Sequence, residues 1–153
     1  MTIIKNGLDL RPVYNNVKSC YGKAHVNGVL YEAQDEGEDN LIEINLVSYN
    51  TLATSIKIYY NEFTHEWDTM EILNNGRYSV TTTRHQKDFL FQAGLNEAEI
   101  RKALTNGGLI LNVPVKCTGE GLDLQQLKKR GYITAWIMML YRAKLDQKES
   151  EED

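Results

Sequence analysis

The spacing of apolar residues changes near residue 80, and that change limits the folds open to this chain. Before it, apolar and polar residues alternate or β-branched residues cluster, as in 41–47, 54–60 and 67–73. These patterns are typical of half-buried strands. After it, Phe89, Leu90 and Ala93 recur at helical spacing. The sequence therefore predicts strands followed by helices, which is the α+β class.

The first half predicts an antiparallel meander. Residues 24–26 and 29–31 flank Asn27-Gly28, the residue pair that most strongly indicates a two-residue hairpin. We therefore expect two separate strands joined by this pair, and a second turn over 61–65. Short connections favour pairing between strands that follow each other in the sequence, so we expect four or five sequential strands from this half.

The second half carries start and stop signals for helices. A helix over 82–93 would end at Gly94, which supplies a left-handed stop. Asn96 and Glu99 have the spacing of a capping box, and the helix that they open would end at Asn106-Gly107-Gly108. Three further elements are predicted: a strand over 109–115, a short helix over 123–130, and a buried helix over 132–145 with a core strand as the alternative.

These elements predict one α+β domain over residues 1–145. In it an antiparallel sheet of about four to six strands, mostly from the first half, packs against three to four helices from the second half. A chain of 153 residues is long enough to bury such a core. Residues 146–153 carry five acids and one lysine, and we expect them to form a disordered acidic tail.

The expected location is the cytoplasm of a bacterial host. The longest apolar run, over 132–141, is about ten residues, whereas a membrane span needs about 20. The first residues do not have the pattern of a signal peptide. Cys20 and Cys117 lie far apart in the sequence, which favours reduced thiols over a disulfide framework.

Charge is distributed unevenly along the chain. Residues 32–71 hold one base and ten acids, whereas residues 72–145 hold eleven bases and five acids. Six acids with no base among them lie within twelve residues: Glu32, Asp35, Glu36, Glu38, Asp39 and Glu43. Such a surface is attracted to a basic cleft, for example the nucleic-acid channel of a nuclease. We therefore expect these six residues to bind a partner, with a soluble loop as the alternative.

Two segments form a motif pair. The first is Ser48-Tyr49-Asn50-Thr51, and the second runs over residues 78–90 as YSVTTTRHQKDFL. Together they resemble a family of small uncharacterised bacteriophage and mobile-element proteins, in which an SYNT turn precedes a YSxTTxRHxxxFL helix start. The resemblance covers about residues 46–93. It implies a phage or mobile-element origin and carries no established activity.

The chemistry of the second segment has two interpretations. Ser79, Thr82, Arg84 and His85 could bind a phosphate at a helix N-terminus, where free N–H groups favour an anion. Alternatively, Ser79 or Thr81 caps the helix, while His85 shares a face with Phe89 and points inward to the 48–51 turn. We favour the second interpretation, in which the motif is structural.

The sequence favours a binding protein over an enzyme. Neither cysteine has the local pattern of an activated nucleophile. Three scattered histidines do not indicate a zinc site, and the acids of 32–43 lack the spacing of a calcium loop. We therefore expect no catalytic residue, no metal and no cofactor.

Three functions follow from these observations. The first is a phage or mobile-element protein that inhibits a host defence nuclease such as a CRISPR effector, as anti-CRISPR proteins do, through residues 32–43. The second is a nucleic-acid-binding regulator that uses the basic region 84–130. Residues 92–104 have the spacing of a helix-turn-helix, but Glu97 and Glu99 would repel phosphates. The third is a structural or accessory phage protein. The apolar residues over 136–141 could form either a homodimer interface or part of the core.

Overall fold

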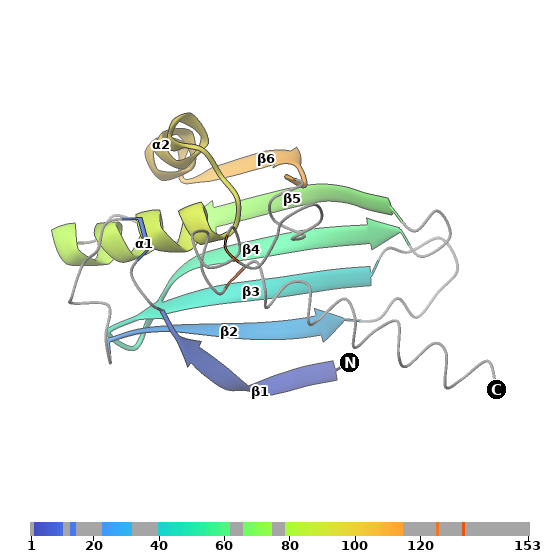
Figure 1. Ribbon diagram of the computed structural model, residues 1–153, viewed down its shortest axis with the longest axis horizontal. Coiled ribbons are helices and arrows are strands. Elements are labelled where there is room, and N and C mark those ends of the chain that lie inside the picture. The colour runs from blue at the N-terminus through green and yellow to red at the C-terminus, as the bar shows by residue number, and fades with distance from the viewer. Residues whose placement is uncertain are drawn as a thin grey trace.

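The computed structural model describes residues 2–10, 13–14, 23–31, 40–61, 66–74, 79–114, 125 and 133. Figure 1 shows their arrangement, with the strands side by side in the order of the sequence. The elements are β1 (Thr2–Asp9), β2 (Ala24–Tyr31), β3 (Asn40–Ser48), β4 (Thr51–Asn61), β5 (Glu66–Asn74), α1 (Val80–Gln92), α2 (Glu97–Asn106) and β6 (Gly108–Asn112).

The sheet is a six-stranded antiparallel meander in the order β1-β2-β3-β4-β5-β6. Alternation along β3 shows how it is oriented: Ile42, Ile44 and Leu46 are buried, and the residues between them are partly exposed. Because successive side chains of a strand point to opposite faces, one face of the sheet carries the core.

The two helices cover that apolar face. α1 packs against β3 and β4, and α2 packs against β5 and β6. Phe89 and Leu90 of α1 and Ile100 and Ala103 of α2 are buried in the same core as the strand residues. The helices therefore lie next to each other on one side of the sheet, each above a different pair of strands.

Local signals set the helix ends. The Ser79 side chain accepts a hydrogen bond from the backbone N–H of Thr82, which makes Ser79 the N-cap of α1. The capping box predicted for Asn96 and Glu99 is confirmed, with both hydrogen bonds present. Gly107 ends α2 in the left-handed conformation, with a φ of 76°.

The predicted fold class is wrong in its number of helices. The described residues form two helices rather than three to four, and strands predominate among them. β1 was not predicted, although it pairs along β2. The helices predicted over 123–130 and 132–145 lie outside the described residues except at Gln125 and Ile133, and Ile133 is buried in the core. The predicted acidic tail over 146–153 also lies outside them.

The hairpin predicted at Asn27-Gly28 is wrong as well. Both residues lie in the middle of β2, where Gly28 pairs with Ile4 on one side and Ile44 on the other. Val26 and Leu30, on either side of Gly28, continue the same buried face without interruption. Pairing with strands on both sides therefore outweighs the local turn preference of the Asn-Gly pair.

Among the helices that the structure describes, none combines the length and the apolar character that crossing a membrane requires.

Gly107 offers a test of the turn between α2 and β6. Its φ of 76° disfavours any residue with a Cβ, although a Cβ there would meet no atom within 4 Å. We expect Gly107→Ala to lower the free energy of unfolding by about 1 kcal/mol, because the left-handed backbone is then strained. Urea denaturation measures this loss. Gly107→Asn should lose less, since Asn tolerates this conformation; an equal loss in both variants would contradict the backbone explanation.

Candidate functional site

The structure brings the two motif segments together. Ser48, at the end of β3, lies with its Oγ 2.8 Å from Nδ1 of His85 and 3.1 Å from Oγ1 of Thr82, both in α1. All three side chains are buried, and His85 is completely excluded from solvent. The motif pair therefore forms a hydrogen-bonded contact between the β3–β4 hairpin and the first turns of α1.

The hairpin itself is strained. Tyr49 and Asn50 both have positive φ, 50° and 69°, and Ser48 pairs with Thr51. This is the backbone of a two-residue type I′ turn, in which a bulky residue such as tyrosine is rare. The Tyr49 ring stacks on the His85 ring with 5.8 Å between centroids, and Lys23 Nζ lies 5.5 Å from the Tyr49 centroid. These contacts hold Tyr49 in its unusual conformation.

The chemistry open to this cluster is limited by its burial. A Ser–His pair at 2.8 Å has the geometry of an activated nucleophile. However, Ser48 is 1% exposed and His85 is 0% exposed, so a substrate cannot reach the Ser48 oxygen. Ser79 is occupied as the helix cap, and Arg84 is exposed. The arrangement links helix to hairpin and leaves no open phosphate site at His85.

Most of the predicted acidic surface lies outside the described residues. Of its six members only Glu43 is described, and it lies in the middle of β3. Its register partner on β4 is Lys57, and its Oε1 accepts a hydrogen bond of 3.2 Å from Asn45 Nδ2. Glu43 therefore belongs to the polar face of the sheet, with a base opposite it.

A second buried polar contact positions Tyr14. The Asp88 carboxylate of α1 accepts hydrogen bonds from the backbone N–H groups of Val13 and Tyr14, at 2.7 and 2.8 Å. The Tyr14 ring then stacks on Phe91 with centroids 4.9 Å apart. A segment far away in the sequence is thus held against the middle of α1, with its phenol directed toward α2.

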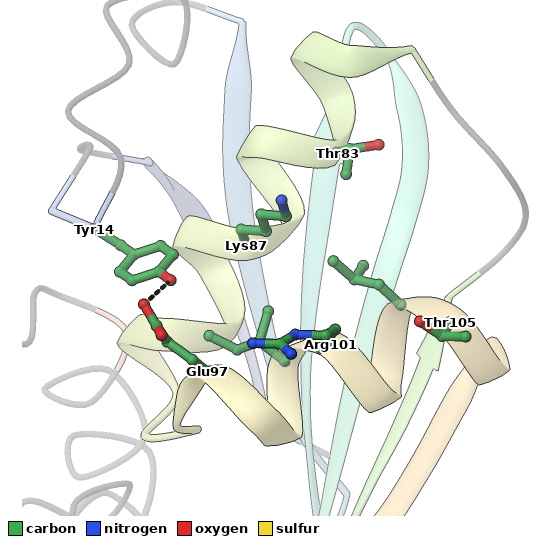
Figure 2. Close-up of a pocket in the computed structure, with 8 residues that line it drawn as sticks. Tyr14, Thr83, Lys87, Glu97, Arg101 and Thr105 are labelled. Atoms are coloured by element: carbon green, nitrogen blue, oxygen red, sulfur yellow. Dashed lines mark hydrogen bonds between the residues drawn. The ribbon is translucent and has the colours of Figure 1, made fainter.

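These contacts enclose a groove between α1 and α2, which Figure 2 shows. Its volume is about 460 Å³. Ile100 and Leu104 supply its apolar lining. The polar side chains come from three segments. Tyr14 comes from the segment before β2, α1 supplies Thr83 and Lys87, and α2 supplies Glu97, Arg101 and Thr105. We call this the α1–α2 groove.

The free charge in the groove is positive. Tyr14 O–H donates to Glu97 Oε1 at 2.8 Å, but Glu97 keeps its negative charge, so Lys87 and Arg101 leave the described lining with a net charge of +1. Glu97 and Arg101 are four residues apart on α2, a spacing that normally allows an ion pair. Within the described part of the chain, however, neither Lys87 nor Arg101 forms an ion pair or a hydrogen bond. Two cations on facing helices are therefore available to an anion.

The neighbouring Glu97 changes the pKa of the Tyr14 phenol. The hydrogen bond to Glu97 raises the pKa of Tyr14 above its ordinary value of 10.0, and partial burial and the negative charge of Glu97 act in the same direction. Arg101 opposes the shift. Tyr14 is therefore a neutral hydrogen-bonding group at physiological pH, and its hydroxyl donates to Glu97 Oε1.

The sequence contains one local signal for this groove. Thr83 and Lys87 are four residues apart in α1. In α2, Glu97, Arg101 and Thr105 follow one another at intervals of four residues. Residues at this spacing share one face of a helix. The two faces could have been derived, but their juxtaposition and the arrival of Tyr14 depend on contacts that no local pattern encodes.

Comparison with known proteins identifies a family of unknown function. The model of a family of unknown function, DUF8033, matches residues 8–107. The matched range contains the hairpin, α1 and α2 and ends before β6. No curated protein and no solved structure matches the chain. The described residues also contain no group of three or more side chains suited to hold a metal ion.

Replacing His85 tests the contact between the motifs. We expect His85→Ala to lower the free energy of unfolding by about 2–4 kcal/mol, because it leaves a cavity and removes a partner from the buried Ser48 hydroxyl. Thermal and urea denaturation followed by circular dichroism measure the loss. Lys87→Ala, at an exposed position of the same helix, is the control and should change stability by less than about 0.5 kcal/mol. Equal stability of His85→Ala and the wild type would exclude a structural role.

Tyr14 provides a pH test. Because its pKa is raised by Glu97, the folded state holds the phenolic proton more tightly than the unfolded state. The resulting stabilisation is complete below the ordinary pKa and is lost as pH rises through the folded-state pKa. A carbon-13 NMR titration of the Tyr14 ring should show ionisation above pH 10.0. In Glu97→Gln the ionisation should move back toward the ordinary value; an unchanged midpoint would show that Glu97 is not the cause.

Proposed function

The chain belongs to the DUF8033 family, and we propose that it is a non-enzymatic binding protein whose α1–α2 groove holds the phosphate backbone of a nucleic acid. The observation that carries the proposal is the pair Lys87 and Arg101. They face one groove from two helices and have no ionic partner within the described residues. Unpaired cations at a shared groove are the feature that an anionic polymer neutralises.

The rest of the groove suits phosphate oxygens. Arginine and lysine contact phosphates most often, and hydroxyl groups of threonine and tyrosine add hydrogen bonds. Thr83 and Thr105 supply two such hydroxyls, one from each helix. Lys102 is exposed on α2 next to Arg101 but does not line the groove, so it separates an effect of the groove from an effect of overall charge.

Several observations support binding over catalysis. The Ser48–His85 pair is buried and closed to a substrate. The described residues that line the groove include no histidine, cysteine or serine, the side chains that most often act as nucleophile or proton acceptor there. Glu97 is already engaged by Tyr14. The groove can hold and orient an anion, and its described lining offers no group to attack one.

Inhibition of a host defence nuclease through residues 32–43 is a separate proposal. It is supported by the run of six acids within twelve residues and by the resemblance of the motif pair to phage and mobile-element proteins. Glu43, the one described member, lies across from Lys57 in the sheet. The α1–α2 groove has a fuller set of described contacts, so we place the nucleic-acid proposal first.

Charge reversal in the groove tests the nucleic-acid proposal. We expect Lys87→Glu with Arg101→Glu to weaken binding of single- or double-stranded oligonucleotides by at least tenfold, because two phosphate contacts become repulsive. Fluorescence anisotropy at several salt concentrations measures affinity. In the wild type, log Kd should rise with log salt concentration, and each lost contact should lower the slope by about 0.9 on a duplex.

Lys102→Glu is the matched control. This substitution changes the net charge by the same amount as Arg101→Glu alone. Lys102 lies next to Arg101 in α2 but does not line the groove. A single Arg101→Glu variant should therefore lose more affinity than Lys102→Glu. Equal losses would indicate a diffuse charge effect, and no salt-dependent binding by the wild type would exclude nucleic acid as the ligand.

A further inference from the structure

Among the strands that the structure describes, β6 is at one edge of the sheet. It pairs with β5 over Gly108 to Asn112, and β5 is its neighbour in the strand order. Asn74 N donates a hydrogen bond of 3.0 Å to Gly107 O, immediately before the strand begins. Hydrogen-bonded and non-hydrogen-bonded pairs alternate along an antiparallel ladder. Leu109 and Leu111 therefore direct their backbone groups to β5, and Gly108, Ile110 and Asn112 direct theirs outward.

The outward groups have no partner within the part of the chain that the structure describes. None of Gly108, Ile110 and Asn112 takes part in a further hydrogen bond there. The side chain between them is exposed too: Ile110 is 70% exposed, the highest fraction among the large apolar residues described. An uncharged edge strand with an exposed isoleucine is a ready template for another strand.

Several devices that protect natural edge strands are absent from the five residues of β6. Lysines, inward-pointing charges, bulges or prolines within the strand prevent pairing with another chain. β6 has the sequence Gly-Leu-Ile-Leu-Asn, and its register with β5 runs without a shift. Pro114 follows the strand by two residues and leaves all outward N–H groups of β6 in place.

We propose that this edge is a self-association site, at which a second copy of the chain adds its own β6 in antiparallel orientation. Pairing about a two-fold axis at Ile110 sets Ile110 opposite the partner's Ile110 and Gly108 opposite the partner's Asn112. Each outward pair can then exchange two backbone hydrogen bonds. The apolar side chains meet each other, and no like charges are opposed.

Local shape fits this occupant. A hollow of about 540 Å³ borders Ile110 and is lined in part by Leu73 and Gly108. Gly108 has no side chain, and a Cβ there would lie 2.9 Å from the Ile72 carbonyl oxygen. In the proposed pairing the partner's Asn112 lies opposite Gly108 and meets no cross-strand side chain there, because glycine has none. A strand of another sequence would need the same small and apolar alternation, which the chain itself provides.

The expected dimer is weak, because an interface of one strand pair buries less than a standard stable interface of about 1,600 Å². It would join two sheets into one continuous sheet. The proposal rests on the β6 edge alone and is independent of what the groove binds.

Sedimentation velocity over a concentration series up to about 1 mM tests the proposal, since dimers with dissociation constants up to that value become visible. We expect the wild type to shift toward a dimer and Ile110→Lys to remain monomeric with an unchanged circular dichroism spectrum. Val80→Lys is the matched control, because Val80 is 69% exposed on α1, and it should dimerise like the wild type. A monomeric wild type, or a dimer that persists in Ile110→Lys, would overturn the proposal.

A disulfide trap identifies the edge directly. In a background with Cys20→Ser and Cys117→Ser, we introduce Ile110→Cys. Opposed residues of a hydrogen-bonded antiparallel pair have Cα atoms about 5.5 Å apart, within the range of a disulfide. Oxidation should yield a covalent dimer of Ile110→Cys and none of Val80→Cys. The proposal is refuted if the Ile110→Cys variant stays monomeric in pure solution and instead forms a covalent adduct with another peptide or protein in a host lysate. That result would show that another occupant pairs with the edge.

Discussion

The hydrogen bond between Ser48 and His85 is a buried polar link between α1 and the sheet, and it acts together with the burial of Phe89 and Leu90. It joins the end of β3 to the second turn of the helix in a buried environment, where a missing partner is costly. One residue further along, Gln86 donates to the Ala53 carbonyl and to Thr54 Oγ1 on β4. Once α1 is held on these strands, Asp88 faces the N–H groups that bring Tyr14 to the groove.

Local patterns were enough to predict much of this layer. Alternation over 41–47 and 54–60 matches β3 and β4, and the capping signals at Asn96 and Glu99 match the start of α2. His85 and Phe89 share one face of a helix because they are four residues apart, which explains the burial of both. Each of these features depends on residues close together in the sequence.

The features that sequence reasoning missed depend on distant residues. Asn27-Gly28 has the strongest local turn signal in the chain, yet strands on both sides hold it extended in β2. The described residues form two helices, whereas the predicted count included the segments 123–130 and 132–145, which lie outside the described residues except at Gln125 and Ile133. The α1–α2 groove combines two helix faces with Tyr14, which is 83 residues from Glu97. No local pattern encodes such a contact.

The Asp88 contact has a consequence for how this protein folds. It joins residues 75 positions apart, so the wall of the groove formed by Tyr14 exists only when the first segment is docked against α1. A partly folded chain, with sheet and helices formed but its first segment undocked, presents an incomplete groove. A ligand that requires the complete groove thus distinguishes native molecules from late intermediates, and its binding shifts the folding equilibrium toward the native state.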